Sequence, residues 1–374
     1  MRILICSLEA PLPPPNGLRV QVAALVRELR KDHEVRVLAL QMPGQEAPPH
    51  SEQLRLIPWS GSAARQLRAP LVEEMDRFHP HVVHVTSGRL ARLGSRLGGR
   101  ASVLAALDAW HLNVTAQADA GSWTSTWTKR AQAWMVKRFE RSEYERFDRV
   151  IVVSEEDRQA LLGVDATLRV EVIPNGVDAD AFDWDGTPRD RGLIVFTGVM
   201  SYAPNVTAAE FLARHVLPWV RRSLPSVQLA LVGRDPAQQV RTLGELPGVE
   251  VVGEVPDLRP WLSRAGAYAC PMLTGTGIKN KLLEAMANGL PCVATPLALQ
   301  GIAARPGEEV MVGSSEEELA GHLAWLLLEA GLADRVGAAG RAYVRANHIW
   351  ASVAREYERV YREVASIEGH GARS

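Results

Sequence analysis

A glycine-rich turn followed by a polar helix is the segment of this chain best suited to bind an anion. It lies within ACPMLTGTGIKNKLLEAMANGLPCVAT, residues 269–295, where a strand is predicted to end near Met272. A helix then begins near Ile278 and closes at Asn288-Gly289, a sequence typical of helix C-termini. Because the first N–H groups of a helix have no intrahelical partner, this turn predicts a phosphate site. Gly277 lets a phosphate approach the backbone closely.

The charged side chains of the same segment extend that prediction. Lys279 and Lys281 add positive charge. Helical spacing predicts a polar stripe separate from the apolar one, consisting of Gly277, Asn280, Lys281, Glu284 and Asn288. A carboxylate can accept two hydrogen bonds from a diol, so Glu284 could hold ribose hydroxyls while the helix start holds a diphosphate. The alternative is a surface ion pair between Lys281 and Glu284, worth a few tenths of a kcal/mol.

Other candidates follow strands predicted nearer the N-terminus. In LDAWHLN, Asp108 and His111 leave the carboxyl end of a predicted strand, the edge at which parallel sheets bind ligands. A single histidine is more often structural than catalytic, so both roles stay open for His111, whereas His84, inside a strand, is interpreted as packing. Gly17 lies in the turn before the first helix, where it either faces a ligand or simply connects strand to helix. Arg19, in the first turn of that helix, could reach a phosphate.

Short apolar runs that alternate with amphipathic helical segments must position these residues. Unalternated Val, Ile and Leu runs separated by helices predict parallel sheets covered on both faces. The scheme occurs twice, so we predict an α/β fold of two Rossmann-like, doubly wound domains, 1–176 and 177–349, facing a central cleft. The Asp- and Gly-rich segment 175–192 is interpreted as the linker, and a last helix is predicted at about 350–366. The predicted strands are 2–6, 34–40, 82–85, 102–107, 150–153, 170–173, 193–196, 228–232, 249–252, 268–271 and 292–295.

Composition narrows the class of protein. The 374 residues carry a formal net charge of −1, less basic than is usual for a protein that binds nucleic acid. Cys6, Cys270 and Cys292 are too scattered for a metal-binding pair and favour a reducing compartment. The first apolar run is too short for a signal peptide, and no stretch approaches the roughly 20 residues that span a bilayer. We therefore expect a cytoplasmic protein that can still sit at the inner face of a membrane.

Residues 123–147, WTSTWTKRAQAWMVKRFERSEYERF, have the pattern of a basic amphipathic helix. Such a helix can lie on an anionic membrane, or it can pack on its own sheet. Because Glu140, Glu143 and Glu145 dilute the positive charge, packing is favoured and peripheral membrane contact is the alternative. The apolar stripe consists of Trp127, Ala131, Trp134, Met135 and Phe139.

Several of these segments together resemble glycosyltransferase family 4, a family of retaining GT-B enzymes. Residues 275–289 are similar to the Glu-x7-Glu region of that family, and VIPNGVDADAF, 172–182, resembles its domain-crossing signature. LALVGRDP, 229–236, resembles the strand and glycine turn near the nucleotide base, and 253–271 resembles the stretch before the donor loop. The resemblance covers most of 172–295 and is confined to the first strand, glycine loop and helix in the other half.

The resemblance implies a nucleotide-sugar donor bound mainly by the second domain and a C-terminal helix that packs back on the first. The acceptor would be a carbohydrate, a lipid-linked glycan or a small molecule. Glu284 matches the family's second motif glutamate, which holds the ribose. Thr276 replaces the first motif glutamate, and the backbone amides of Gly277 and Ile278 could supply the missing contact to the donor sugar. Further donor contacts are assigned to Gly17, Gly198, Gly233, Lys279 and Asn280.

The chain departs from the family a second time at the loop 196–206, which lacks the usual arginine and lysine for the diphosphate. It resembles a branch with a Tyr-x-Pro-Asn loop and a Gly-Ile-x-Asn-Lys donor loop. We therefore predict that Lys279 and Lys281 neutralise the diphosphate. The family often places a His or Asp at the position of Asp108 and His111, so the catalytic role is assigned to these two residues together with Lys281.

The expected reaction is metal-independent, cofactor-free transfer of a sugar to an acceptor hydroxyl with retention. No Asp-x-Asp metal signature suits a strand-end loop, and Asp178-Ala179-Asp180 lies in the predicted linker. No residue stands out as a covalent nucleophile, which is consistent with front-face attack by the acceptor. The competing interpretations are a sugar-nucleotide epimerase or a phosphorylase on the same fold, and a non-catalytic protein that kept the GT-B fold.

Overall fold

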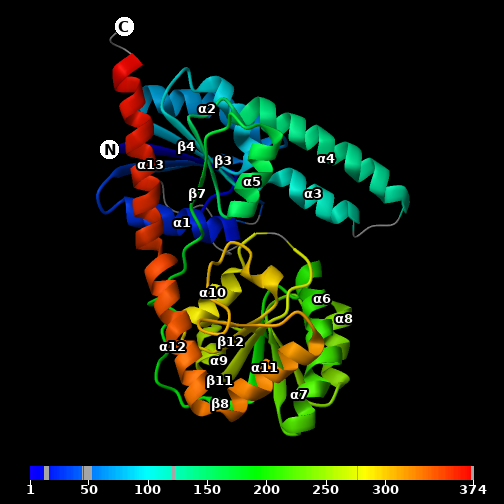
Figure 1. The fold of residues 1–374 in the computed structure, drawn as a ribbon. Helices are drawn as coiled ribbons and strands as arrows, with labels where there is room; N and C mark the ends of the chain where they lie inside the picture. Colours follow the sequence, from blue (N-terminus) through cyan, green and yellow to red (C-terminus); the bar gives the residue numbers. More distant parts are fainter. Residues whose placement is uncertain (12–16, 44, 46–52, 120–122, 276, 372–374) are drawn as a thin grey trace. The chain divides into compact units, whose positions relative to one another are not determined.

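The computed structural model describes the chain except for residues 12–16, 44, 46–52, 120–122, 276 and 372–374. It divides into two compact units (Figure 1). Unit 1 comprises Met1–Gly176 and Trp350–Ser374, and unit 2 comprises Val177–Ile349. Each unit is a parallel β-sheet with helices on both faces, so the prediction of two Rossmann-like α/β domains is confirmed.

The sheet of unit 1 has the strand order β3-β2-β1-β4-β5-β6-β7, and its pairings are parallel. The chain winds outward from β1 in both directions, so the order reverses between β1 and β4, the place where such sheets bind ligands. The strands are β1 (Arg2–Ser7), β2 (Glu34–Gln41), β3 (Leu54–Pro58), β4 (Val82–Thr86), β5 (Ser102–Leu107), β6 (Arg149–Val152) and β7 (Val170–Val172).

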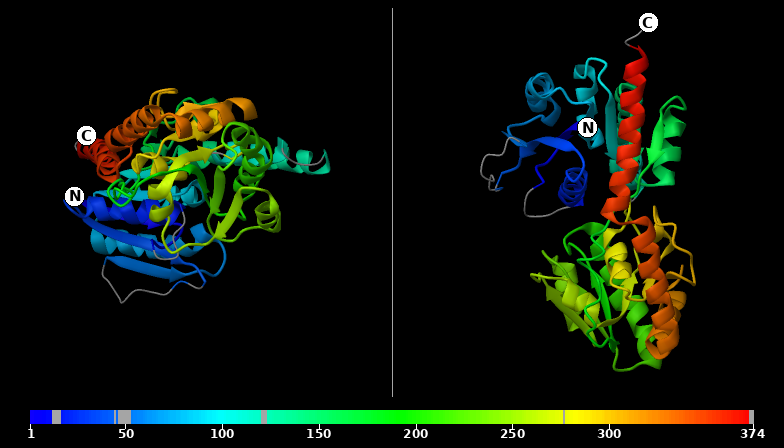
Figure 2. Two further views of the ribbon diagram at one scale, coloured as in Figure 1. Left: turned by 90° about the horizontal axis from the view of Figure 1, so that it is seen from below. Right: turned by 90° about the vertical axis from the view of Figure 1, so that its left-hand side faces the viewer.

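Helices cover the two faces of this sheet with separate apolar layers. Leu4 and Cys6 point to one face and Ile3 and Ile5 to the other, because side chains alternate along a strand. The first layer contains α2 (Ala63–Phe78), η1 (Gly88–Arg96) and α5 (Glu155–Val164), and the second contains α1 (Gly17–Leu29) and α13 (Trp350–Gly371). Figures 1 and 2 show α13 running along this unit, whereas α3 (Trp110–Asp119) and α4 (Trp123–Tyr144) extend beyond the sheet as a helical pair.

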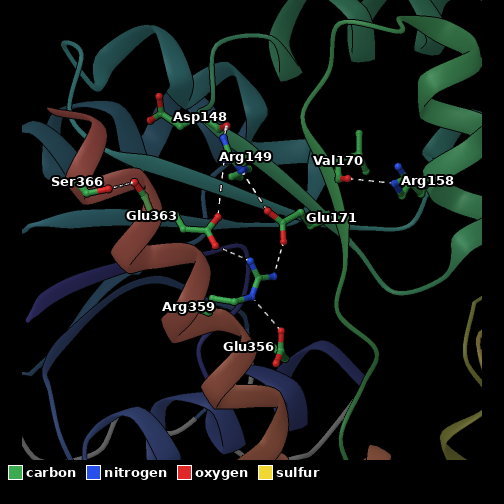
Figure 3. Close-up of polar contacts among 9 residues, drawn as sticks. All are labelled: Asp148, Arg149, Arg158, Val170, Glu171, Glu356, Arg359, Glu363 and Ser366. Carbon is green, nitrogen blue, oxygen red and sulfur yellow. Dashed lines mark hydrogen bonds and ion pairs between the residues drawn. The ribbon is translucent and has the colours of Figure 1, made fainter. Parts of the chain in front are cut away.

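An ion-pair network fastens α13 to the edge strand β7 (Figure 3). Arg359 donates to Glu171 at 2.5 Å and to Glu363 at 2.7 Å, and Arg149 holds the other carboxylate oxygen of Glu171 at 3.2 Å. The hydrogen bond to Glu171 is the main reason that the pKa of Arg359 is raised. The network ties residues nearly 200 positions apart, although partly exposed pairs of this kind add only about 0–1 kcal/mol each.

The sheet of unit 2 has the order β10-β9-β8-β11-β12-β13 and the same winding, with the reversal between β8 and β11. One apolar cluster packs the helices onto both of its faces. The strands are β8 (Asp190–Thr197), β9 (Gln228–Val232), β10 (Val249–Gly253), β11 (Ala265–Cys270), β12 (Cys292–Ala294) and β13 (Met311–Val312). The helices are α6 (Ala203–Phe211), η2 (Leu212–Val216), α7 (Leu217–Ser223), α8 (Gln238–Arg241), η3 (Thr242–Glu245), α9 (Arg259–Arg264), α10 (Asn280–Ala287), η4 (Pro296–Leu299), α11 (Glu316–Leu328) and α12 (Ala330–Asn347).

Two edge strands escaped the sequence-based prediction. β3 is half exposed along most of its length, so it lacks the continuous apolar run that marked the buried strands. β13 has only two residues. Among the described residues, none of the helices is long and apolar enough to cross a membrane.

Candidate functional site

The carboxyl edge of the unit 2 sheet brings two glycine loops into backbone contact. Gly198 follows β8, Gly233 follows β9, and a Cβ atom added at Gly233 would lie 1.7 Å from the carbonyl oxygen of Gly198. No side chain fits there, so the two loops can approach this closely only with glycine at position 233. Gly198 and Gly233, which are predicted to contact a donor, therefore have a structural role as well. They allow the two loops to approach each other where the strand order of the sheet reverses.

The loop between β11 and α10 is held by a lysine that folds back on it. Gly275 and Gly277 have φ angles of 98° and 73°, which favour glycine. The buried Lys279 side chain donates from Nζ to the carbonyl oxygens of Gly277 at 2.5 Å and Gly275 at 3.3 Å. Lys279 thus fixes the loop with its own charge, and α10 begins at Asn280, two residues later than predicted. Thr276 lies outside the described residues.

Lys281 joins the two motifs that the sequence suggested separately. Its Nζ donates a hydrogen bond to Oδ1 of Asn205, which belongs to the Tyr-x-Pro-Asn loop, and lies 4.7 Å from the centre of the Phe196 ring. The Asn205 amide in turn donates to the carbonyl oxygen of Val199 at 2.9 Å, which fixes its orientation. Burial lowers the pKa of Lys281 to about 8, so the ammonium is held charged in a place that disfavours charge. An anion bound beside it would relieve that cost.

Glu284 lies on the next turn of α10, three residues after Lys281. Burial raises the pKa of its carboxyl group to about 7, and the neighbouring Lys281 opposes that rise. The buried hydroxyls of Tyr268 on β11 and Thr197 on β8 form a hydrogen bond with each other at 2.9 Å. Among the described residues, the structure gives the Glu284 carboxylate no hydrogen-bond donor. Its acceptor oxygens are thus available for hydroxyl groups of a ligand.

Asn288, placed by spacing on the same stripe, is a structural residue. Its side chain is fully buried and donates to the carbonyl oxygen of Phe182 at 3.1 Å and to the Ser263 hydroxyl at 3.2 Å. Arg189 donates to its carbonyl and amide oxygens at 3.0 and 3.2 Å. Asn288 therefore has a structural role, because its hydrogen-bonding groups are occupied within the protein.

The carboxyl edge of the unit 1 sheet is kinked just before Asp108. Leu107 has a φ of 75°, a costly conformation for a branched residue, and the pairing of β5 with β6 shifts register between Ala105 and Leu107. The buried Asp157, at the start of α5, accepts a hydrogen bond from the amide of Ala109 at 2.9 Å. The turn that carries Asp108 and the start of α3 is thus held in a strained shape, as is common at binding sites.

His111 is oriented by a buried glutamate. Its Nδ1 lies 2.6 Å from Oε2 of Glu140 on α4, and its backbone N–H donates to Oε1 of the same carboxylate at 3.2 Å. His111 is 3% exposed and Glu140 is 0% exposed, so the pair is fixed inside the protein. A carboxylate at one ring nitrogen fixes the tautomer and leaves the other nitrogen to act. The charges of Glu140 and Asp108 add to the burial that raises the pKa of the nearby Tyr144 hydroxyl.

The packing prediction for α4 is wrong for three residues of the predicted apolar stripe, because Ala131, Trp134 and Met135 are exposed. Trp134 is 63% exposed and Met135 is 57% exposed, whereas the buried face carries Ala133, Val136 and Glu140. The helix is rotated relative to the predicted stripe because Glu140 turns inward to His111. The side chain of Trp127 lies outside the described residues.

A cavity of about 500 Å³ lies beside this helix, next to the His111–Glu140 pair. Trp110 and Phe139, the neighbours of those two residues in sequence, form its aromatic wall with ring centres 6.0 Å apart. Arg89 and Arg92 from η1 also line it, and neither forms an ion pair with a described carboxylate. The cavity therefore combines an apolar wall with positive charge.

The remaining candidates of unit 1 have partners inside the protein. Arg19 pairs with Glu9 at 2.7 Å, so its charge is already balanced. Gly17 is the first residue of α1, which agrees with the prediction that it lies where the chain enters the first helix. His84 is buried and its Nδ1 lies 2.5 Å from the Tyr361 hydroxyl of α13, which agrees with its interpretation as packing.

Known protein families and individual relatives match this chain in sequence. Residues 15–181 match Glycosyltransferase Family 4, and residues 191–329 match Glycosyl transferases group 1. The chain is 30% identical to a phosphatidyl-myo-inositol mannosyltransferase of Mycobacterium tuberculosis, over 100% of this chain and 99% of the relative. It is 28% identical to the mannosyltransferase of the same description from Mycobacterium leprae, over 98% of both chains.

The chain belongs to the family 4-like GT-B glycosyltransferases. Solved structures agree with this assignment at the level of the fold. The sucrose-phosphate synthase of Thermosynechococcus elongatus superimposes with a TM-score of 0.75 at 17% identity, covering 98% of this chain and all of that one. Anabaena HepE in complex with UDP gives a TM-score of 0.70 at 15% identity, covering 97% of this chain and all of that one.

Two residues of the candidate site were not predicted from the sequence. In the sequence Glu140 only dilutes the charge of a basic helix, yet its carboxylate holds His111 across 29 positions of sequence. Asp157 supports the same turn from another helix. Neither has a local signal, because contact between α3, α4 and α5 is set by the tertiary fold. Among the described residues, His, Cys, Asp and Glu side chains form no group of three or more arranged to hold a metal ion.

Proposed function

We propose that this glycosyltransferase moves a sugar from a nucleotide-sugar donor to an acceptor hydroxyl with retention of configuration and without a metal ion. The observation that carries the proposal is the arrangement on α10, where Lys281 is held by Asn205 and Glu284 lies one turn further on. This places a partly buried cation and a carboxylate without a described hydrogen-bond donor at the carboxyl edge of a Rossmann-like sheet, the usual place for a nucleotide. The relative HepE was crystallised with UDP, which is consistent with a nucleotide here.

The two α10 side chains have complementary tasks in this proposal. Glu284 accepts hydrogen bonds from the ribose diol, and Lys281 lies against the diphosphate. As the glycosidic bond breaks, negative charge grows on the diphosphate, and a fixed ammonium stabilises that charge without a metal. Lys279 contributes indirectly, because its ammonium group holds the carbonyl oxygens of Gly275 and Gly277 in place. The acceptor hydroxyl attacks the same face of the sugar and loses its proton to the departing phosphate.

His111 and Asp108 act on the sugar or the acceptor in this scheme. The Glu140 carboxylate fixes His111 so that its Nε2 can bond a hydroxyl group, and the strained turn at Leu107 directs Asp108. Each positions a polar group before the substrate arrives, which reduces the ordering cost of binding.

The acceptor is proposed to carry a lipid or other apolar part, and α4 is proposed to touch the membrane that holds it. The exposed Trp134 and Met135 lie among Lys137 and Arg138, a pattern suited to an anionic interface. The mannosyltransferase relatives are named for a phosphatidylinositol, which is in keeping with this proposal. The protein would then work at the inner, cytoplasmic face of a membrane.

A two-step experiment tests the proposed reaction. A thermal-shift panel of UDP, GDP, ADP and dTDP identifies the base, since a ligand at 100 times its Kd stabilises by about 2.7 kcal/mol. The matching nucleotide sugars are then incubated with vesicles and soluble acceptors, with and without EDTA, and the products are analysed for linkage. We expect α-linked product from an α-linked donor in both conditions. An inverted product, an epimerised donor, a free sugar 1-phosphate, or activity abolished by EDTA would contradict the proposal.

A further inference from the structure

A second cavity lies in unit 2 at the edge of the sheet opposite the α10 site. It has a volume of about 570 Å³, within the usual range for small-molecule sites. Its lining includes Gly266, at the start of β11, and Pro291, just before β12. Because β8 runs from Asp190 to Thr197, the amino ends of the strands and the Gly198 loop lie at opposite edges. The cavity is therefore separate from the donor site.

A poorly compensated cation forms one wall of this cavity. Arg189 donates from Nη1 to the carbonyl oxygens of Leu262 at 3.0 Å and Ser263 at 3.3 Å, and from Nη2 to Asn288. All of these acceptors are neutral, and the structure gives Arg189 no ion pair with a described carboxylate. Burial lowers the pKa of Arg189 to about 10 in spite of the opposing influence of Asp334 and others. The guanidinium stays charged at neutral pH and would be stabilised by a nearby anion.

An aromatic platform lies over the same guanidinium. The Trp184 ring centre is 5.1 Å from the Arg189 guanidinium carbon, and the indole N–H donates to the carbonyl oxygen of Thr187 at 2.9 Å. This fixes the ring, yet 42% of Trp184 is exposed. A fixed and partly exposed indole is a surface on which a ligand ring can pack.

Three further charged residues of the lining define the polar partners that a ligand would meet. Arg191 is exposed and has no ion pair with a described carboxylate, and α12 contributes Arg341, which already pairs with Asp183. Asp334, also on α12, is exposed and lies in the same lining. The cavity thus offers guanidinium groups for an anion and a carboxylate that can accept hydrogen bonds from hydroxyls.

We propose that this cavity binds a phosphorylated sugar, with its phosphate at Arg191 beside the Arg189 charge, its ring against Trp184 and a hydroxyl bonded to Asp334. Guanidinium groups match phosphate oxygens in pairs, which a neutral sugar could not use. A ligand there would bridge the 184–191 segment and α12, so it would stabilise unit 2 without entering the donor site. The site is independent of the reaction proposed above.

Titration calorimetry on the full chain tests this site, with glucose 1-phosphate, glucose 6-phosphate and inorganic phosphate as probes. We expect saturable binding of at least one sugar phosphate, with inorganic phosphate at least 10-fold weaker because it cannot use the ring. Arg191→Ala and Trp184→Leu should each weaken binding at least 10-fold. Both residues are exposed and outside the donor site, so turnover should stay within 2-fold of the wild type.

The matched control is Lys281→Ala, which changes the donor edge alone. Binding of the sugar phosphate should be unchanged in this variant and in the presence of saturating UDP. Loss of binding in Lys281→Ala, competition by UDP, equal affinity for inorganic phosphate, wild-type affinity in Arg191→Ala, or no saturable binding of any probe would each overturn the proposal.

Discussion

The carboxyl edges of the two sheets treat their charged residues in opposite ways. In unit 1, His111 and Glu140 are within 2.6 Å of each other and almost completely buried, so they satisfy one another inside the protein. In unit 2, Glu284 has no described hydrogen-bond donor, and both it and Lys281 have pKa values shifted by burial against their charged forms.

In the proposed reaction this difference would give the two edges different tasks. The hydrogen-bonded His111–Glu140 pair costs the folded protein little stability when no substrate is bound, and it holds the second ring nitrogen of His111 in a fixed position. A pair that is strained toward neutrality stores a cost that a ligand can remove, which favours binding of a charged molecule with hydroxyl groups. Unit 1 would then supply orientation and unit 2 most of the donor affinity.

Removing the Lys281 charge should give the largest effect and is the most direct way to break this comparison. Lys281→Ala is expected to lower kcat/KM by roughly 10²–10³-fold, because developing diphosphate charge loses its fixed cation. Asn205→Ala should cost roughly 10-fold by releasing the ammonium. In the double variant the two losses should not add, since Asn205 acts through Lys281. Initial rates at saturating acceptor measure kcat/KM for the donor in the single and double variants. Normal turnover in Lys281→Ala, or full additivity of the two losses, would exclude the proposed role of Lys281.

Glu284 tests the idea that the unit 2 edge sacrifices stability for binding. Its pKa of about 7 in the folded protein exceeds the ordinary value of 4.5, so the folded state holds the proton more tightly. The free energy of unfolding should therefore fall as the pH rises from about 4.5 to about 7. Glu284→Gln should be more stable than the wild type at pH 8 by roughly 1–3 kcal/mol, with a smaller difference at pH 5.

Urea unfolding at the two pH values measures that difference, and the exposed Glu250→Gln is the control that should show none. The same Glu284→Gln variant should raise the donor KM by roughly 10-fold, because an amide accepts fewer hydrogen bonds from the ribose diol. If Glu284→Gln is stabilised but its donor KM is unchanged, the buried carboxylate costs stability without binding the donor, and the proposed role of Glu284 is wrong.

Glu140 tests the orienting task of the unit 1 edge. Glu140→Gln keeps the size of the side chain but no longer fixes the His111 tautomer, so kcat should fall roughly 10-fold while the donor KM stays within 2-fold. Glu143→Gln on the same helix removes only a surface pair with Arg146, which lies just after the helix, and should leave both constants unchanged. A rise in donor KM equal to the fall in kcat/KM would mean that this edge also binds the donor.

The exposed face of α4 should give the smallest effect on catalysis. Replacing Trp134 and Met135 by serine should weaken sedimentation with phosphatidylserine–phosphatidylcholine vesicles by roughly 10-fold, because the apolar anchor is lost. Activity toward a soluble acceptor should stay within about 2-fold, and vesicles of phosphatidylcholine alone should bind weakly in either case. Unchanged vesicle binding would leave α4 as a purely intramolecular helix.

The sequence by itself determined the two Rossmann-like sheets and the segment that forms α10. Both follow from local rules: buried parallel strands read as unbroken apolar runs, and glycine turns followed by helices are recognisable along the chain. The half-exposed β3 and the two-residue β13 lacked that signal. The roles of Gly198 and Gly233 were visible only as turn residues, and their backbone contact was not.

The tertiary structure alone decided which polar groups meet. Helical spacing put Glu284 and Asn288 on one stripe. The side chain of Asn288, however, is hydrogen-bonded to Arg189 and Ser263, whereas the Glu284 carboxylate has no hydrogen-bond donor among the described residues. Spacing also placed Trp134 on the buried side of α4, but the inward turn of Glu140 to His111 reversed it. Periodicity states which residues share a face, and only packing against other segments decides which face is buried.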